Sequence, residues 1–190
     1  AGEVEIFEDP SAKGGAFANM YEGTDTSYGK ITNGKLHAVI DSGSVITFYH
    51  EDGRVLLKEH FRRLRDEERM PLNIMGREYS NGVGDNFRIV TRFVARKGEK
   101  IFGMGQYQQH ELDLKGCMLE LAQRNSQVSV PFYLSSIGYG FLWNNPGVGQ
   151  VMFANNGTEW VTESGKEIDY LVIAGDTPAE IEENYMTLTG

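Results

Sequence analysis

The sequence has a single cysteine, Cys117, among its 190 residues. One thiol cannot form an internal disulfide or assemble a thiolate zinc site, so packing alone must stabilise the fold. The four histidines, His37, His50, His60 and His110, do not show the spacing of metal ligands. We therefore predict that the protein uses neither a metal ion nor another cofactor.

Long apolar runs are also missing. No stretch approaches the roughly 18 apolar residues of a membrane span, and the opening segment AGEVEIFEDP lacks the basic and apolar regions of a signal peptide. We expect a cytoplasmic protein with no membrane partner, although a chain that begins with Ala1 leaves the removal of a leader open. Basic residues number 18 against 27 acidic ones, which gives a net charge of −9. This charge disfavours nucleic acid as a partner and favours a neutral ligand.

Common catalytic motifs are absent too. Gly103 and Gly105 form a G-x-G, but Gln108 replaces the third glycine and a strand pattern follows, so a dinucleotide site is excluded. The serines lack the setting of a nucleophile elbow. Close carboxylates such as Glu111 and Asp113 have a spacing that is also typical of turns and exposed strands. We predict no catalytic residue in this chain.

The sequence is rich in short β-prone runs separated by glycine and asparagine turns. Residues 34–59 read as a β-meander, because alternate residues of 35–40 are apolar and turns at 41–44 and 51–53 lead into the β-prone runs 45–49 and 54–57. In residues 87–96 a mostly apolar set with two phenylalanines alternates with a second set that includes three arginines, which predicts a half-exposed strand. The predicted fold class is all-β, mainly antiparallel, with one β-sandwich core.

One helix is predicted, at the C-terminal end. Thr177 and Glu180 form a capping box, and Pro178 occupies the first helical position. The apolar stripe of this helix consists of Ile181, Tyr185 and Leu188. The predicted organisation is a poorly defined segment over residues 1–28, a sandwich domain over 29–176 and a helix within 177–190.

Three stretches resemble the N-terminal domain of glycoside hydrolase family 31, the α-glucosidases and α-xylosidases. They are FGMGQYQQHELDLKG at 102–116, ELAQRNSQVSVPFYLSSIGYGFLWNNP at 120–146 and EIDYLVIAGDTPAEIEENY at 167–185. The resemblance depends on the G-x-G-Q strand, the L-D-L-K-G loop, the P-F, G-Y-G and I-D-Y motifs, and the start of the helix. The meander at 34–59 extends it to most of the chain.

The resemblance implies a galactose-mutarotase-like β-sandwich beside a (β/α)8 barrel that carries two catalytic aspartates. In the family this barrel follows the helix, so we expect 177–190 to be a linker helix and this chain to be inactive without its barrel. The whole enzyme would hydrolyse an α-linked glucoside or xyloside with retention, using one carboxylate as nucleophile and the other as acid and base. Glucosyl or xylosyl specificity and the oligomeric state remain open.

The resemblance also implies that a sandwich loop reaches the barrel mouth and shapes the leaving-group subsite. By position this loop is Gln123, Arg124, Asn125 and Ser126, which are polar and suited to hydrogen-bond sugar hydroxyls. The family often has an aspartate in this neighbourhood, and this sequence has none. We predict Gln123, Arg124 and Asn125 as residues at the edge of the substrate site.

Two alternatives remain. A stand-alone carbohydrate-binding sandwich would stack sugars on exposed aromatic rings, although aromatic residues in a sandwich more often belong to the core. The candidates are Tyr107, Tyr133, Tyr139, Trp143 and Trp160. An aldose-epimerase-like protein would need histidines and a glutamate that converge in a cleft, and the scattered histidines do not match that pattern.

Overall fold

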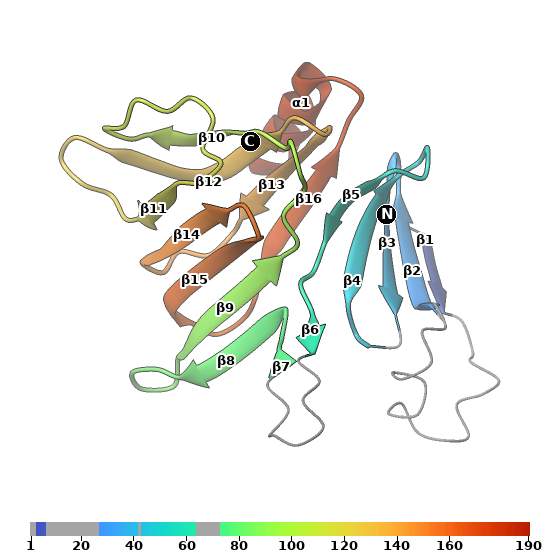
Figure 1. The fold of residues 1–190 in the computed structure, drawn as a ribbon, viewed down its shortest axis with the longest axis horizontal. Coiled ribbons are helices and arrows are strands. Elements are labelled where there is room, and N and C mark those ends of the chain that lie inside the picture. Colours follow the sequence, from blue (N-terminus) through green and yellow to red (C-terminus); the bar gives the residue numbers. More distant parts are fainter. Residues whose placement is uncertain (1–2, 7–26, 42, 64–72) are drawn as a thin grey trace. The chain divides into compact units, whose positions relative to one another are not determined.

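The described part of the chain consists of antiparallel β-sheets and a C-terminal helix in the computed structural model, which confirms the predicted fold class (Figure 1). The structure describes residues 3–6, 27–41, 43–63 and 73–190. The chain divides into two compact units, Ala1–Glu59 and His60–Gly190.

The first unit is one antiparallel sheet whose strands pair in the order in which they occur along the chain. Its strands are β1 (Glu3–Ile6), β2 (Ser27–Asn33), β3 (Leu36–Asp41), β4 (Ile46–His50) and β5 (Val55–Lys58). Gly34 and Gly53 have positive φ angles of 56° and 86° in the tight turns that join these strands. The meander predicted from residues 34–59 is therefore confirmed.

Strand β1 lies inside the segment 1–28 that the sequence predicted to be poorly defined. It pairs with β2, from Glu3 opposite Thr32 to Ile6 opposite Gly29. Residues 7–26 of the same segment lie outside the described residues.

The second unit contains two larger antiparallel sheets and a short hairpin of β6 (Arg62–Arg63) and β7 (Asn73–Ile74). One sheet has the strand order β10 (Ile101–Gln106), β12 (Val128–Ser135), β13 (Tyr139–Trp143) and β16 (Tyr170–Ala174). The other has the order β11 (Met118–Leu121), β14 (Gly149–Ala154), β15 (Gly157–Gly165), β9 (Phe87–Phe93) and β8 (Arg77–Asn81).

These two sheets face each other across an aromatic core. Phe141 of β13 stacks on Trp160 of β15, with ring centroids 5.1 Å apart, and Tyr133 of β12 stacks on Phe141 at 5.4 Å. Trp143 also stacks on Trp160, and its indole nitrogen donates a hydrogen bond to Thr162 Oγ1 at 3.1 Å. The predicted β-sandwich is present in this unit.

The boundary at Glu59 falls inside the range 29–176 for which the sequence predicted one domain. Strands β2 to β5 pair only with strands of their own unit, so they do not extend either sheet of the sandwich. Alternation of apolar and polar residues identifies a strand, but it does not tell which sheet the strand joins. The division into two units was therefore not visible in the sequence.

Helix α1 (Pro178–Thr189) begins where the capping box predicted. The Thr177 hydroxyl oxygen accepts a hydrogen bond from the backbone N–H of Glu180 at 3.2 Å. The Glu180 carboxylate accepts from the backbone N–H of Asp176 at 3.0 Å, one residue earlier than in a standard capping box. These two bonds satisfy polar groups at the start of the helix.

The predicted apolar stripe of α1 is only partly confirmed. Ile181 is buried at 1% exposure and Tyr185 stacks on Phe132 of β12, but Leu188 is 57% exposed. The helix contacts β13 and β16, so its first turns cover the sheet while Leu188, in the last turn, stays exposed. The helical periodicity correctly predicted which face of α1 packs on the sheet, but it did not predict that the contact ends before Leu188.

Candidate functional site

The loop predicted to face a substrate connects β11 of one sheet to β12 of the other, and within it Arg124 and Gln127 form a hairpin of a single antiparallel bridge. The backbone N–H of Gln127 donates to the carbonyl of Arg124 at 3.1 Å, which places Asn125 and Ser126 at the two central positions. Both side chains are exposed. The hairpin thus presents an amide and a hydroxyl at its tip.

The Gln123 side chain closes the base of this hairpin. Its amide oxygen accepts from the backbone N–H of Ser129 at 3.0 Å, and its amide nitrogen donates to the Ser129 carbonyl at 2.8 Å. The Tyr107 hydroxyl donates to the Glu120 carbonyl at 3.0 Å and lies 2.8 Å from the Ser129 hydroxyl. Burial raises the pKa of Tyr107, so this phenol remains a donor at neutral pH.

Arg124 is held by Glu120 on the preceding strand. The guanidinium donates from Nε to Glu120 Oε2 at 2.8 Å and from Nη2 to Oε1 at 2.6 Å, a two-pronged arrangement. The hydrogen bond with Glu120 raises the pKa of Arg124. The side chains of Gln123 and Arg124 are therefore both engaged within the hairpin, whereas the Asn125 side chain is exposed at its tip.

An open cavity of about 660 Å³ adjoins the hairpin through Gln123 and Ser129. Its lining also includes Pro131, Trp143 and Asn144, and none of its lining side chains is charged. The volume is in the range of small-molecule sites. An uncharged lining with amide groups is suited to a neutral, polar ligand.

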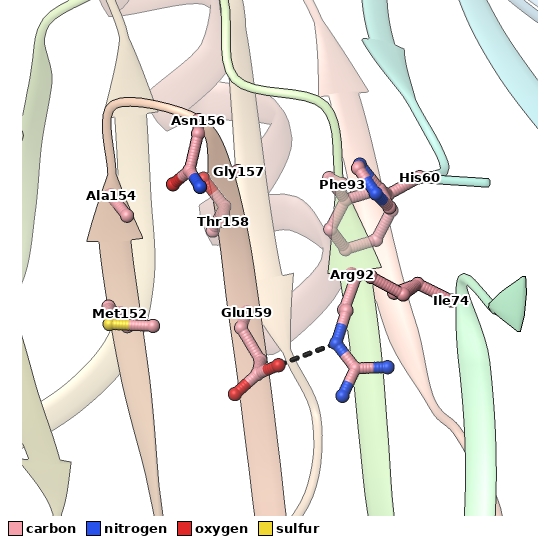
Figure 2. Close-up of a pocket in the computed structure, with 10 residues that line it drawn as sticks. All are labelled: His60, Ile74, Arg92, Phe93, Met152, Ala154, Asn156, Gly157, Thr158 and Glu159. Carbon is pink, nitrogen blue, oxygen red and sulfur yellow. Dashed lines mark hydrogen bonds and ion pairs between the residues drawn. The ribbon is translucent and has the colours of Figure 1, made fainter. Parts of the chain in front are cut away.

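A second, smaller cavity of about 230 Å³ lies over strands β9, β14 and β15 (Figure 2). Its charged lining residue Arg92 is paired with Glu159 at 2.5 Å and with Glu78 at 2.7 Å, so the guanidinium is already neutralised. Asn156 and Thr158 line the same cavity (Figure 2). Arg92 here links three neighbouring strands and is not free to bind an anion.

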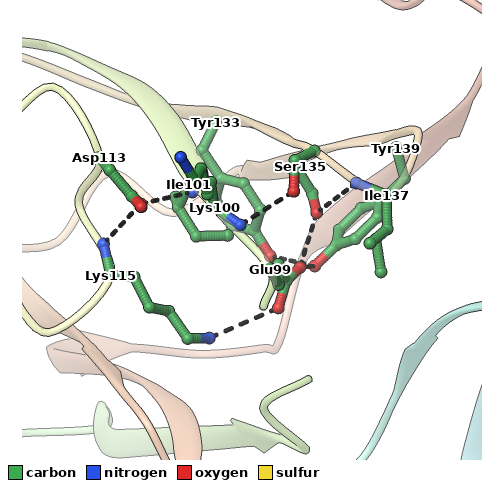
Figure 3. Close-up of polar contacts among 10 residues, drawn as sticks. Glu99, Lys100, Ile101, Asp113, Lys115, Tyr133, Ser135, Ile137 and Tyr139 are labelled. Carbon is green, nitrogen blue, oxygen red and sulfur yellow. Dashed lines mark hydrogen bonds and ion pairs between the residues drawn. The ribbon is translucent and has the colours of Figure 1, made fainter. Parts of the chain in front are cut away.

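Glu99 is the most buried carboxylate among the described residues of the second unit, and polar contacts surround it (Figure 3). Ser135 donates to Glu99 Oε1 at 2.6 Å, Tyr139 donates to the same oxygen at 2.9 Å, and Lys115 lies 3.4 Å from Oε2. Tyr139 uses its one hydroxyl hydrogen on Glu99, so Tyr133 is the donor in the 3.0 Å bond between the two tyrosines. Glu99 is a structural anchor, because both of its oxygens are occupied.

The family-like motifs have structural roles here. In the G-x-G strand β10, Gly103 and Gly105 adopt positive φ angles, and a Cβ on Gly105 would lie 2.2 Å from the Val128 carbonyl oxygen. The register of β10 with β12 shifts at this point, so the glycines form a β-bulge. In the L-D-L-K-G loop, Asp113 accepts from the backbone N–H groups of Ile101 and Lys115 (Figure 3).

Four of the aromatic residues considered for sugar stacking are unavailable for it. Tyr133, Tyr139, Trp143 and Trp160 are at most 2% exposed, because they form the core between the two sheets. Sequence reasoning instead missed an exposed aromatic pair, Tyr79 and Phe87, whose rings meet edge to face at 5.9 Å. The burial removes the main support for a sugar-stacking platform.

Among the described residues, no group of three His, Cys, Asp or Glu side chains is arranged to hold a metal ion. The same part of the chain contains no helix that is long and apolar enough to cross a membrane.

Comparisons with known proteins point to one family. No family model matches the chain. A protein from Pseudescherichia vulneris, named as an uncharacterized family 31 glucosidase, is 44% identical over 171 residues, which are 84% of this chain and 32% of that protein. The α-xylosidase of Saccharolobus solfataricus is 34% identical over 113 residues, which are 55% of this chain and 16% of that enzyme.

Comparison with solved structures points to the same family. The crystal structure of a GH31 α-xylosidase from a soil metagenome, complexed with xylose, matches with a TM-score of 0.81 and 40% sequence identity. The match covers 97% of this chain and 26% of that one. The chain therefore spans about a third or less of the length of each of these relatives.

Proposed function

This chain belongs to glycoside hydrolase family 31, and we propose that it forms the non-catalytic N-terminal sandwich of a retaining α-glycosidase. The observation that carries the proposal is the match of nearly the whole chain to about a quarter of an α-xylosidase. Its partner would be a catalytic barrel encoded with it. The single thiol, Cys117, is compatible with a reducing compartment, and we propose the cytoplasm.

The reaction would be hydrolysis of an α-linked glucoside or xyloside. Retaining glycosidases need two carboxyl groups about 5 Å apart, one as nucleophile and one as acid and base. The most buried carboxylate of the described sandwich, Glu99, is occupied by three partners, and Asp113 is tied to two backbone N–H groups. We propose that both catalytic carboxylates come from the barrel.

The sandwich would contribute the turn between β11 and β12 to the edge of the substrate site. The turn at Asn125 and Ser126 offers exposed, uncharged hydrogen-bonding groups, and the adjoining cavity has an uncharged lining. Both features suit the hydroxyl groups of a sugar in the leaving-group subsite.

The test is to assay the 190-residue chain alone and joined to a family 31 barrel. We expect no turnover of aryl α-glucosides or α-xylosides by the chain alone. The joined protein should hydrolyse one of them and release a product with the original anomeric configuration, as read by NMR. Turnover by the isolated chain that is abolished when one of its own carboxylates is substituted would contradict the proposal.

A further inference from the structure

We propose that Asn33 is a site of spontaneous deamidation, and that the fold protects the other asparagine–glycine pairs of the chain from the same reaction. The sequence has three such pairs: Asn33 with Gly34, Asn81 with Gly82, and Asn156 with Gly157. Asparagine is a thermolabile residue, and a following glycine has no Cβ to hinder attack by its backbone nitrogen. The inference does not depend on the proposed function.

The reaction joins the backbone to the asparagine side chain. The deprotonated amide nitrogen of Gly34 forms a bond with Asn33 Cγ, the bond from Cγ to Nδ2 breaks, and the side-chain nitrogen leaves as ammonia. Solvent water then opens the resulting cyclic imide. Hydrolysis at Cγ gives aspartate, whereas hydrolysis at the backbone carbonyl carbon gives isoaspartate. Nothing is oxidised or reduced, and the amide is exchanged for a carboxylate.

Exposure of the side chain does not distinguish the candidate sites. Asn33, Asn81 and Asn156 are all exposed. What differs is the backbone nitrogen of the following glycine, which has to lose its proton and approach the side chain. An N–H that donates a hydrogen bond keeps both its proton and its position until that bond is broken.

At Gly34 this nitrogen is not engaged. Asn33 pairs with Leu36, so Gly34 is the first residue of the two-residue turn between β2 and β3. In such a turn the closing hydrogen bond is donated by the residue that follows the turn, and not by the first turn residue. Among the described residues, none accepts from the Gly34 N–H and none is hydrogen-bonded to the Asn33 side chain. The attack at Asn33 therefore breaks no existing hydrogen bond of either group.

At the other two pairs the fold holds the attacking nitrogen. The Gly82 N–H donates to the Asn86 carbonyl at 3.0 Å. Gly157 is the first residue of β15 and pairs with Ala154 across a two-residue turn, so its N–H has the position that closes the turn. Attack at either site requires the hairpin to open locally, and the small population of the open state slows the reaction.

The product would alter the turn between β2 and β3. Isoaspartate inserts a methylene group into the main chain directly before Gly34. Because loop length sets the register of a hairpin, this insertion is incompatible with the pairing of Asn33 and Leu36. Aspartate keeps the normal backbone and adds only a negative charge. We therefore expect isoaspartate to weaken the β2–β3 pairing and aspartate to preserve it.

The experiment incubates the full chain in mildly alkaline buffer, both folded and unfolded in urea. Mass spectrometry of proteolytic peptides follows each asparagine–glycine pair. The unfolded chain is the matched control, because each asparagine then precedes glycine without any fold around it. The rate in urea divided by the rate in buffer gives the protection at each site.

We expect Asn81 and Asn156 to be protected at least about fivefold more than Asn33, since breaking one hydrogen bond already slows the reaction by about that factor. The incubated chain should also exchange its β2 and β3 amide hydrogens faster than Asn33→Asp, which has the new charge on a normal backbone.

Two outcomes would overturn the inference. If Asn33 is protected as strongly as Asn81 or Asn156, the turn does not expose it to the reaction. If the chain that carries isoaspartate exchanges its β2 and β3 amide hydrogens no faster than Asn33→Asp, the modification does not disturb the turn. Neither outcome bears on the proposed function, because no glycoside is used in the measurement.

Discussion

Phe132 of β12 stacks on Tyr185 of α1, with ring centroids 4.0 Å apart and planes 12° apart. Beside this pair, Ile181 packs into the space left by Gly140, where a Cβ would lie only 2.7 Å from an Ile181 methyl carbon. The helix is thus fixed on the sheet that also contains β10 and β12.

Replacing Ile181 with alanine should destabilise the second unit, because the side chain is buried between α1 and the sheet. We expect a loss of about 2–5 kcal/mol in the free energy of unfolding, measured by urea titration of the 190-residue chain. Leu188→Ala is the control, since Leu188 is 57% exposed, and should change stability by less than about 0.5 kcal/mol. Equal effects of the two substitutions would contradict the described docking.

The bulge in β10 predicts a strong effect of Gly105→Ala. The new Cβ would meet the Val128 carbonyl oxygen at 2.2 Å in a backbone conformation with φ of 90°. Gly84 has φ of 67°, but a Cβ added there would have no atom within 4 Å, so Gly84→Ala tests the conformational cost alone. We expect Gly84→Ala to lower the free energy of unfolding by about 1–2 kcal/mol, and Gly105→Ala to lower it by at least about 2 kcal/mol more. If thermal unfolding shows similar losses of stability for the two substitutions, the β-bulge at Gly105 is contradicted.

The buried network predicts that Glu99→Ala is costly. The substitution leaves Ser135 and Tyr139 without their acceptor and Lys115, whose side chain is 11% exposed, without its partner. We expect a loss of about 3–5 kcal/mol in the free energy of unfolding. The exposed Glu163→Ala should lose less than about 1 kcal/mol. A Glu99→Ala protein as stable as this control would show that the network does not support the fold.

The same cluster predicts a loss of stability in alkali. Burial raises the pKa of both Tyr133 and Tyr139, with the Glu99 charge adding to it. A phenol whose folded pKa is raised contributes stability that is complete below the unfolded pKa of about 10 and is lost as the pH rises above it. Unfolding free energies should fall by about 1.4 kcal/mol per pH unit for each tyrosine that stays protonated in the fold. Tyrosine ionisation can be monitored by ultraviolet absorbance. If all the tyrosines ionise near pH 10 while the protein stays folded, the predicted loss of stability is contradicted.

The fold was largely predictable where local chemistry determines structure. Thr177, Pro178 and Glu180 specify a helix start by capping alone, and alternation identified the strands of the meander and β9. Local patterns could not show that β2 to β5 form a separate unit or that Leu188 lies beyond the sheet. Both depend on which elements meet in three dimensions.

That the loop at Gln123 to Ser126 faces a substrate stays a prediction, and the contacts of its side chains could not be foreseen from the sequence. Motif order placed the loop at Gln123 to Ser126, and the structure puts Asn125 and Ser126 at its tip. Arg124 and Glu120 are four residues apart, a spacing that suggests a helix pair, yet Glu120 lies on strand β11 and Arg124 at the start of the turn that follows it. Glu99 gave no signal, because a glutamate between lysines looks like a solvated loop until Tyr139 and Ser135 are brought to it by strand pairing.

The most direct test of the central claim is the effect of Asn125→Ala on kcat/KM in the joined enzyme, with a disaccharide and an aryl glycoside compared. If the turn contacts the leaving-group sugar, the disaccharide should lose about five- to tenfold, and the aryl glycoside, whose leaving group needs less positioning, should lose less. The melting temperature should not change, because Asn125 is exposed at the tip of the hairpin. Equal losses on both substrates, or a matching fall in melting temperature, would show that the loop supports structure and not the substrate.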